Sequence, residues 1–395
     1  MLIAVVGKSN TGKTTFFSAA TLVDAEISNR IFTTIEPNRG VSYVRVDCVC
    51  KKLGVACNAK NSKCVNNVRF IPIKMIDIAG LVPGAHEGKG LGNQFLSNIM
   101  EADALIHVVD ISGATDSDGN PVEPGSFDPI NDIKFLPEEI NYWILGILKK
   151  NWEHICNHIK ATKEKLDDAI YKQLSGLKID PEDIKEAIKK TGFSAIADDE
   201  KMLEFIDVLL KKSKPIVIAA NKIDLKASEK NIKKITEQGF DVTPCCAEAE
   251  LTLRKAEQKG LIKYSPGGTR FETISDDMDD KQKQALEFLR SKIINKYGST
   301  GVQKIINKTV FDVLDYIAVY PVTNINRLTD KMGNVLPDVY LIPKDTNLKN
   351  FAGIIHSDMK EKFIGGLKKE GDKAIKIGAE YKLQNNDIVE ILKKK

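Results

Sequence analysis

The chain has 395 residues, of which 42% are hydrophobic and 28% are charged, and its 58 Lys and Arg against 54 Asp and Glu leave a net charge of +4. This composition predicts a folded globular protein of two or three domains, and it excludes a nucleic-acid binder that depends on a strongly basic tail. Residues 316–395 by themselves carry a net charge of +4, so any preference for an anionic partner is concentrated there.

The beginning of the chain predicts a cytoplasmic location. Residues 1–6 lead directly into Gly7, which is too short for the apolar region of a signal peptide. No later apolar run approaches the ~20 residues that a membrane-spanning helix needs. We therefore expect a cytoplasmic protein without a membrane partner, in which the seven cysteines are thiols or metal ligands rather than disulfides.

Four short apolar runs predict an α/β fold. They are rich in Val and Ile, alternate with helical patterns, and cover Leu2–Val6, Phe70–Ile76, Ala104–Val109 and Pro215–Ala220. Such runs are typical of a parallel sheet that is covered by helices on both faces. The expected core is a P-loop type of parallel sheet flanked by helices.

The segment between the third and fourth runs is much longer than a crossover needs. It contains a loop over residues 112–129, followed by charged, amphipathic helical patterns over 137–212. We expect residues 113–212 to form a helical insertion that divides one α/β domain into two parts, residues 1–112 and 213–315.

The last part of the chain predicts a separate α+β domain over residues 316–395. Short strand patterns at Ile317–Val322, Asp338–Ile342 and Asp387–Leu392 surround one helical pattern at Leu348–Leu367.

A phosphate-binding loop is predicted directly after the first strand. Residues 7–14 fit the pattern G-x-x-x-x-G-K-[ST], between a strand and a helix, where that motif is required to lie. Its glycines allow backbone N–H groups to surround phosphates, the lysine neutralises the β and γ oxygens, and the threonine hydroxyl binds Mg²⁺. A glycine-rich turn is the alternative for this octapeptide alone. The expected nucleotide-binding residues here are Gly7, Lys8, Ser9, Asn10, Thr11, Gly12, Lys13, Thr14 and Thr15.

Two further motifs follow strands in the order that a GTPase needs. Asp77 ends the second strand, where a carboxylate completes the Mg²⁺ site with Thr14, and Gly80 brings its N–H to the γ-phosphate. Residues 221–224 read Asn-Lys-Ile-Asp after the fourth strand. The Asp224 carboxylate accepts from both N1–H and the amino group of guanine, a donor pair that adenine lacks. Each tetrapeptide alone is explained by an exposed turn, but three motifs in order favour GTP.

With these motifs the chain resembles the Obg family of translation-factor-related GTPases, in the branch that contains the YchF proteins, over nearly its whole length. Residues 121–127 and the cysteine-rich insert point to the archaeal and eukaryotic side of this branch. The resemblance implies that residues 32–38 are the first switch, with Thr34 sensing Mg²⁺ and the γ-phosphate, and that residues 80–92 are the second. Residues 316–395 are similar to a TGS domain, and residues 329–334 and 385–387 carry this similarity.

Two departures from that family affect which nucleotide we expect the chain to bind and how its base is recognised. The YchF proteins lose the N-K-x-D signature and prefer ATP, whereas this chain retains Asn221, Lys222 and Asp224; we expect GTP, with an ATP-preferring YchF-like hydrolase as the alternative. The family's serine-alanine element at the base is expected at Cys246 and Ala247, with backbone N–H groups on the guanine O6.

The residues of the reaction predict slow intrinsic turnover. The position after Gly80, where many GTPases have a water-orienting glutamine, is Leu81. The expected catalytic residues are Lys13, Thr34 and Gly80. Asn10 resembles the asparagine that ligates K⁺ in potassium-stimulated relatives, so K⁺ is a candidate cofactor beside Mg²⁺. His86 is a candidate for positioning water, although a switch histidine is more often solvated or faces a partner.

Four cysteines fall within one short segment, at Cys48, Cys50, Cys57 and Cys64. Four thiolates close a tetrahedral structural Zn²⁺ site. Because the usual pair is C-x2-C and here the first pair is C-x-C, free or oxidised thiols remain an alternative.

The predicted function is a switch that binds GTP and GDP, with the ribosome or another RNA as partner through the TGS domain. The alternatives are a nucleotide-gated module that binds protein without RNA, and a small-molecule nucleotide hydrolase or kinase, which would leave Asn221 and Asp224 unexplained.

Overall fold

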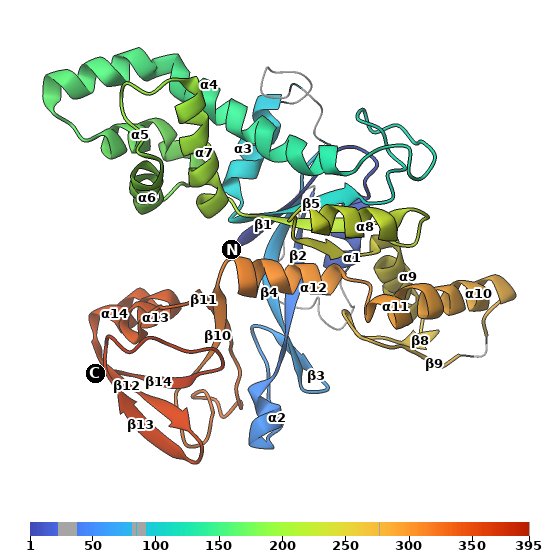
Figure 1. Ribbon diagram of the computed structural model, residues 1–395. Coiled ribbons are helices and arrows are strands. Elements are labelled where there is room, and N and C mark those ends of the chain that lie inside the picture. Colours follow the sequence, from blue (N-terminus) through green and yellow to red (C-terminus); the bar gives the residue numbers. More distant parts are fainter. Residues whose placement is uncertain (23–37, 81–83, 85–91, 276, 395) are drawn as a thin grey trace. The chain divides into compact units, whose positions relative to one another are not determined.

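The computed structural model describes the whole chain except residues 23–37, 81–83, 85–91, 276 and 395. Its contacts divide it into two compact units. Of the described residues, the first unit comprises Met1–Leu22, 38–40 and those of Lys74–Ile305, and the second comprises Val41–Ile73 and 306–394. Figure 1 follows the chain through both in sequence colours.

A largely parallel sheet forms the centre of the α/β part. Its strand order is β2-β4-β1-β5-β6-β7, and β3 pairs antiparallel with β4. The strands are β1 (Leu2–Val6), β2 (Arg39–Asp47), β3 (Lys63–Val65), β4 (Val68–Asp77), β5 (Ala104–Asp110), β6 (Ile216–Asn221) and β7 (Val242–Pro244). The strands β1, β4, β5 and β6 confirm the four predicted runs, and every residue of β5 is buried, as expected for a central strand. The fold is therefore the predicted P-loop type of sheet.

Two apolar cores pack between this sheet and the surrounding helices. One core joins Ala4, Val6 and Leu105 to α3 and to the inserted helices, and the other joins Val109 and Ala220 to the helices of the C-terminal part of the unit. The helices nearest to the sheet are α1 (Lys13–Thr21), α3 (Gly92–Glu101), α8 (Ser228–Glu237) and α9 (Ala247–Gln258).

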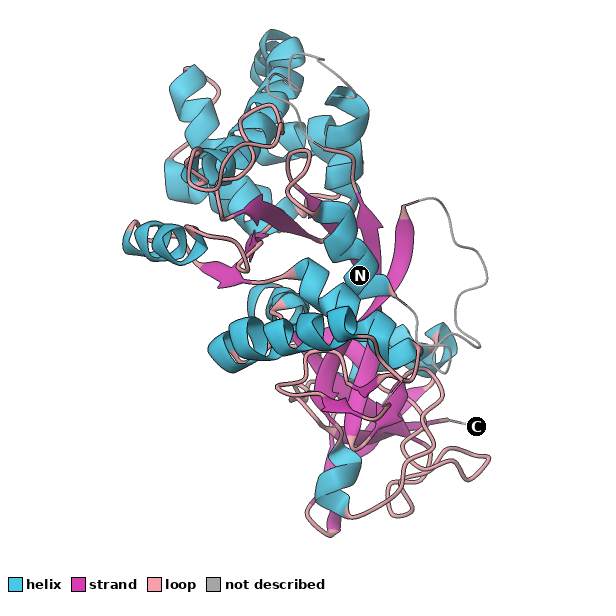
Figure 2. Cartoon of the chain, turned by 90° about the vertical axis from the view of Figure 1, so that its right-hand side faces the viewer, coloured by secondary structure: helices cyan, strands magenta, loops and turns pink. Residues whose placement is uncertain are grey.

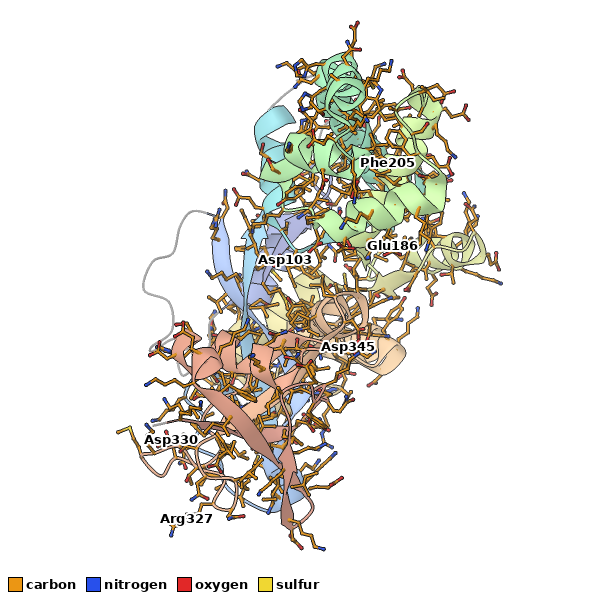
Figure 3. All side chains as sticks on the ribbon, turned by 90° about the vertical axis from the view of Figure 1, so that its left-hand side faces the viewer. Asp103, Glu186, Phe205, Arg327, Asp330 and Asp345 are labelled. Carbon is orange, nitrogen blue, oxygen red and sulfur yellow. The ribbon has the colours of Figure 1, made fainter. Side chains whose placement is uncertain are left out.

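The insertion is helical, as predicted, and its longest helix begins earlier than expected. It consists of α4 (Ile130–Thr162), α5 (Leu166–Leu174), η2 (Ser175–Leu177), α6 (Pro181–Thr191) and α7 (Asp199–Ser213). Helix α4 starts before Pro137, because the buried Ile133, Leu136 and Ile140 continue one apolar face across the proline. Phe205 of α7 is fully buried in this helical core (Figure 3). Among the described residues, none of these helices is apolar enough over its length to cross a membrane.

Short elements connect α9 to the second unit. They are β8 (Ile262–Lys263), β9 (Glu272–Thr273), α10 (Asp280–Phe288), the π-helix η3 (Leu289–Ile294), α11 (Asn295–Tyr297), α12 (Val302–Asn307) and the π-helix η4 (Lys308–Val313).

The C-terminal part of the second unit is a five-stranded sheet with two short helices, drawn in magenta and cyan in Figure 2. The strand order is β11-β10-β14-β12-β13. The elements are β10 (Tyr316–Val322), β11 (Tyr340–Pro343), α13 (Leu348–Ile355), α14 (Ser357–Glu361), β12 (Phe363–Glu370), β13 (Lys373–Ile377) and β14 (Ile388–Lys393). The single helix predicted over Leu348–Leu367 is wrong beyond Glu361, because His356 has an extended backbone and residues 363–370 pair in the sheet.

The second unit also contains the cysteine-rich segment. Helix α2 (Val49–Leu53) and strand β3 lie in it, between β2 and β4. The segments 41–73 and 306–395 are far apart in sequence and fold as one compact unit.

Candidate nucleotide-binding site

The predicted phosphate loop connects β1 to α1 with a backbone that only glycine can adopt at two positions. Gly7 has φ 141° and Gly12 has φ 94°. A Cβ on Gly7 would lie 2.5 Å from the Val108 oxygen, and a Cβ on Gly12 would lie 2.4 Å from the Asn221 amide nitrogen. The loop therefore requires both glycines for conformation and for space.

Lys13 lies at the start of α1 with its amine directed into the phosphate loop. Its Nζ donates to the Lys8 carbonyl at 2.7 Å. Burial lowers the pKa of Lys13 to about 8, and the nearby Asp77 opposes this shift. A buried ammonium without an anionic ligand is poorly solvated, and phosphate oxygens would supply the missing negative charge.

Two of the three predicted Mg²⁺ ligands are brought together. The Thr14 hydroxyl donates to Asp77 Oδ2 at 2.9 Å, although the residues are 63 positions apart in sequence. Asp77 Oδ1 is buried and accepts no hydrogen bond from the part of the chain that the structure describes, and burial raises the pKa of this carboxyl. A hydroxyl and a carboxylate with an unused oxygen are the hard ligands that Mg²⁺ prefers, so the residues fit this ion.

Gly80 lies against the phosphate loop. A Cβ on Gly80 would be 2.6 Å from Ser9 Oγ and 3.0 Å from the Ser9 nitrogen. The backbone of Gly80 thus comes close to the loop, as its expected role at the γ-phosphate requires. The predicted Thr34 of the first switch, and Leu81 and His86 of the second, lie outside the described residues.

Asn221, at the end of β6, connects three parts of the site. Its Nδ2 donates to the Thr11 carbonyl at 2.9 Å, and its Oδ1 accepts from the Ala247 N–H at 3.0 Å. It is buried, so both ends of its amide are satisfied by backbone. One side chain therefore ties the phosphate loop to the N-terminus of α9.

Lys222 and Asp224 follow Asn221 with different surroundings. Lys222 Nζ donates to the Asn10 carbonyl at 2.7 Å and pairs with the buried Asp110 at 2.9 Å. Asp224 is exposed, and its Oδ1 accepts from Cys246 Sγ at 3.2 Å. Burial raises the pKa of Cys246, so the sulfur carries the proton that it donates. The Asp224 carboxylate is thus oriented by Cys246 and open for a ligand.

A buried ion pair that was not predicted from the sequence joins the phosphate loop to the insertion. Lys8 Nζ lies 2.8 Å from Asp132 Oδ2 of α4 and donates to the Thr115 carbonyl at 2.9 Å. Both charged side chains are buried, and burial raises the pKa of Asp132 to about 6. The amine of Lys8, one of the expected nucleotide-binding residues, faces the insertion, and its backbone belongs to the phosphate loop. No sequence signal connected it with a carboxylate in a different predicted domain.

Two other contacts connect the insertion with the site. Asn10 Nδ2 donates to the Gly119 carbonyl at 2.9 Å, so the loop after β5 lies over the phosphate loop. The N–H of Gly84, in the expected second switch, donates to Glu139 Oε1 of α4 at 2.8 Å. Helix α4 therefore contacts both the phosphate loop, through Asp132, and the second-switch segment, through Glu139.

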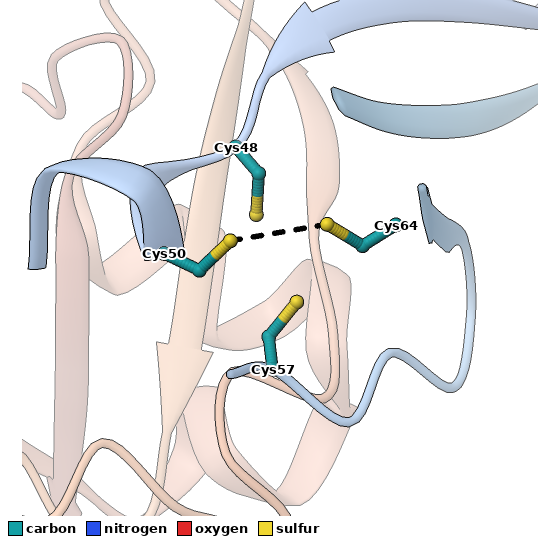
Figure 4. A group of neighbouring side chains, drawn as sticks. All are labelled: Cys48, Cys50, Cys57 and Cys64. Carbon is teal, nitrogen blue, oxygen red and sulfur yellow. Dashed lines mark hydrogen bonds between the residues drawn. The ribbon is translucent and has the colours of Figure 1, made fainter. Parts of the chain in front are cut away.

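The four predicted cysteines converge on one point (Figure 4). The sulfur atoms of Cys48, Cys50, Cys57 and Cys64 all lie within 4.8 Å of one another, and Cys50 and Cys64 are 3.8 Å apart. Four sulfurs around Zn²⁺ at about 2.3 Å stand about 3.8 Å from one another in a tetrahedron. The cluster therefore has the ligand type and spacing to bind Zn²⁺.

The fold and the nucleotide-binding geometry together define a P-loop nucleotide-binding protein. Family models match three parts of the chain: residues 2–140 match "50S ribosome-binding GTPase", residues 219–324 match "Obg-like GTPase YGR210-like, G4 motif-containing domain", and residues 331–393 match "TGS domain". The first contains the phosphate loop and Asp77, and the second contains Asn221 and Asp224.

Similar proteins span the whole chain. The "Uncharacterized GTP-binding protein MJ1332" of Methanocaldococcus jannaschii is 46% identical over 99% of this chain and 98% of its own. The "Ribosome-binding ATPase YchF" of Bacillus subtilis is 29% identical over 98% and 97%. The crystal structure of a GTP binding protein from Pyrococcus horikoshii OT3 is 37% identical, covers 100% of both chains and has a TM-score of 0.79. The chain belongs to the Obg-like GTPases, in the MJ1332 and YGR210-like branch that is related to YchF and carries a C-terminal TGS domain.

Proposed function

We propose that this protein binds guanine nucleotides, hydrolyses GTP slowly with Mg²⁺, and acts as a cytoplasmic switch on the ribosome or another RNA-containing partner. The observation that carries the nucleotide part is the position of Asn221, which links the phosphate loop to the base element at Ala247 and is followed by the exposed Asp224. Phosphate and base recognition are thus connected in one network.

The proposed site uses the residues predicted from the sequence. Gly7–Thr15 hold the phosphates, with Lys13 supplying positive charge; Asn221, Lys222, Asp224, Cys246 and Ala247 surround the base. Thr14 and Asp77 would hold Mg²⁺, with Thr34 as a third ligand, and the ion supplies charge neutralisation at the β and γ oxygens. Gly80 and Thr34 would respond to the γ-phosphate, and their release after hydrolysis would be read by a partner.

The first experiment is titration of nucleotide-free protein with GDP, ADP and xanthosine diphosphate, for the wild type and for Asp224→Asn. The asparagine retains a carbonyl for N1–H but presents an NH₂ group to the guanine amino group, while xanthine offers an oxygen there. We expect the wild type to prefer GDP and the variant to prefer the xanthine nucleotide, with a change in the ratio of at least about 100-fold. Equal binding of ADP by the wild type would instead favour the ATP-preferring alternative, which the name of the Bacillus subtilis relative motivates.

The partner proposal rests on the match to the TGS domain, on the net charge of +4 in residues 316–395, and on the printed names of ribosome-binding relatives. Cosedimentation with ribosomes at rising salt tests it, because phosphate contacts weaken steeply with ionic strength. Binding that is absent at low salt would favour the alternative, a nucleotide-gated module that docks protein partners.

We also propose K⁺ as an activating ion at Asn10. Its Nδ2 is held by Gly119, and among the described residues its Oδ1 accepts no hydrogen bond, which leaves an oxygen for a cation. Hydrolysis should be faster in KCl than in NaCl, and Asn10→Ala should remove the difference. Equal wild-type rates in both salts would contradict the proposal.

Zn²⁺ is proposed as a structural ion in the four-cysteine cluster. Elemental analysis of dialysed protein should give one zinc per chain, and the double variant Cys57→Ser with Cys64→Ser should give none.

The proposed functional division is a GTPase domain over 1–112 and 213–315, a helical insertion over 113–212 and a TGS domain over 316–395.

A further inference from the structure

A buried arginine lies between the four-cysteine cluster and the C-terminal sheet of the second unit. Arg69, in β4, has no exposed surface. Its Nη1 donates to Cys57 Sγ at 3.5 Å, its Nη2 donates to the Leu336 carbonyl at 2.6 Å, and its guanidinium stands over the Tyr320 ring at 5.6 Å. One side chain therefore contacts the cluster and two parts of the TGS region.

The buried Arg69 forms no direct ion pair with a described carboxylate, and the nearby Asp338 interacts with it only at longer range. Among the described residues, no carboxylate lies within ion-pair distance of Arg69, and its Nε has no hydrogen-bond partner. A buried charge is tolerated only when it is paired. Four thiolates around a divalent metal carry a net charge of −2, which places an anion in direct contact with this guanidinium. Four neutral thiols would leave it without a contacting anion among the described residues.

The cysteine segment is also joined to residues 335–339, here called the docking strand, by backbone pairing. The Asn58 N–H donates to the Val335 carbonyl at 2.8 Å, and the Lys60 N–H donates to the Pro337 carbonyl at 2.7 Å. The Asn61 side chain donates to the Val339 carbonyl at 2.8 Å and accepts from the Val339 N–H at 3.0 Å. These residues lie between Cys57 and Cys64, so their position depends on how the cluster closes.

A surface ion pair reinforces this pairing. Lys60 Nζ lies 3.1 Å from Asp330, which is labelled in Figure 3 and belongs to the turn just before the docking strand. Exposed pairs contribute little by themselves. The buried contact from Arg69 to Leu336 is therefore the connection by which the charge state of the cluster reaches the docking strand.

We infer that metal binding by the four cysteines and seating of the docking strand are a single coupled event, with Arg69 as the positioning residue that couples them. The inference deepens the zinc proposal and depends on it. Loss of the metal removes the negative charge beside Arg69 and releases residues 335–339 from residues 58–61. The metal would then control the structure of the surface that begins the TGS domain.

Hydrogen exchange tests the coupling in the full-length protein. Zinc-loaded, chelated and zinc-reconstituted samples are compared, and exchange at Val335 and Val339 should rise at least about tenfold on chelation and return on reconstitution. GDP binding is measured on the same samples, because it should stay unchanged if only this part of the chain responds. If a sample has measurably lost its zinc and hydrogen exchange is unchanged, the coupling is overturned while the zinc proposal stands. Protein that never binds zinc would overturn both.

Variants of Arg69 separate the coupling from simple packing. Arg69→Met keeps the length of the side chain without its charge, and Arg69→Lys keeps the charge with one donor group. Affinity for Co²⁺ is measured from the thiolate-to-cobalt absorption band. We expect Arg69→Met to lower this affinity by about 10–100-fold and to raise hydrogen exchange at Val339 even at saturating metal. Compared with Arg69→Met, Arg69→Lys should recover Co²⁺ affinity to a larger extent than it recovers protection of Val339 from hydrogen exchange. The control is Lys52→Met, at an exposed position of α2; wild-type affinity in Arg69→Met would overturn the inference.

Discussion

Lys13 is the residue whose electrostatics give the most direct prediction. Its amine is buried in the phosphate loop, and burial holds its pKa at about 8, below the ordinary value of 10.5. Bound phosphates require the charged form, so the protein must take up a proton wherever the free lysine is neutral. The uptake should be about a tenth of a proton at pH 7 and about half a proton at pH 8, and GDP affinity should fall as pH rises above 8.

Calorimetric titration with GDP in two buffers of different ionisation enthalpy measures this uptake. Lys13→Met should bind GDP more weakly and should lose the uptake between pH 7 and pH 8. A wild type whose binding enthalpy does not depend on the buffer at pH 8 would show that Lys13 is already charged before nucleotide binds.

At the scale of elements, helix α4 is anchored to the nucleotide site at its N-terminal part. Asp132 pairs with Lys8 under the phosphate loop, and Glu139 accepts from Gly84. Asp132→Asn leaves the Lys8 ammonium buried without its partner, and this should lower the free energy of unfolding by about 3–5 kcal/mol. Because Lys8 belongs to the phosphate loop, GDP affinity should fall as well. Urea unfolding and GDP titration measure the two effects.

The double variant Lys8→Met with Asp132→Leu is the control for this ion pair. It removes both charges and replaces them with apolar side chains of similar size, so it should recover most of the lost stability. A double variant as unstable as Asp132→Asn would mean that packing around α4, rather than an unpaired charge, explains the loss.

The elements that could be predicted from the sequence are those whose signal is local. The strands β1, β4, β5 and β6 are apolar runs, and the phosphate loop, Asp77 and Asn221 belong to short motifs at strand ends. The start of α4 was missed because Pro137 suggested a boundary, while packing of Ile133 and Ile140 continues the helix. Arg69 could not be predicted, because its partners Cys57 and Leu336 lie 12 and 267 residues away.

At the scale of the whole molecule, the two compact units are joined by strands that run through both. Residues 39–40 of β2 belong to the first unit and residues 41–47 to the second, and β4 passes from the second unit into the first between Ile73 and Lys74. β4 therefore carries Arg69 of the metal-linked segment and ends at Asp77 of the proposed Mg²⁺ site.

This connection predicts how ligands act on thermal unfolding. GDP binds residues of the first unit, so at 100 times its dissociation constant it should stabilise that unit by about 2.7 kcal/mol, while chelation of zinc should destabilise the second. Calorimetry should then show two unfolding transitions. GDP should raise the midpoint temperature of one, and chelation of zinc should lower the midpoint temperature of the other. The shared β4 adds a further expectation: chelation should also lower the GDP-sensitive transition slightly, because unfolding of Val68–Ile73 removes the strand that positions Asp77. A single transition that responds equally to GDP and to chelation would mean that the two units unfold as one.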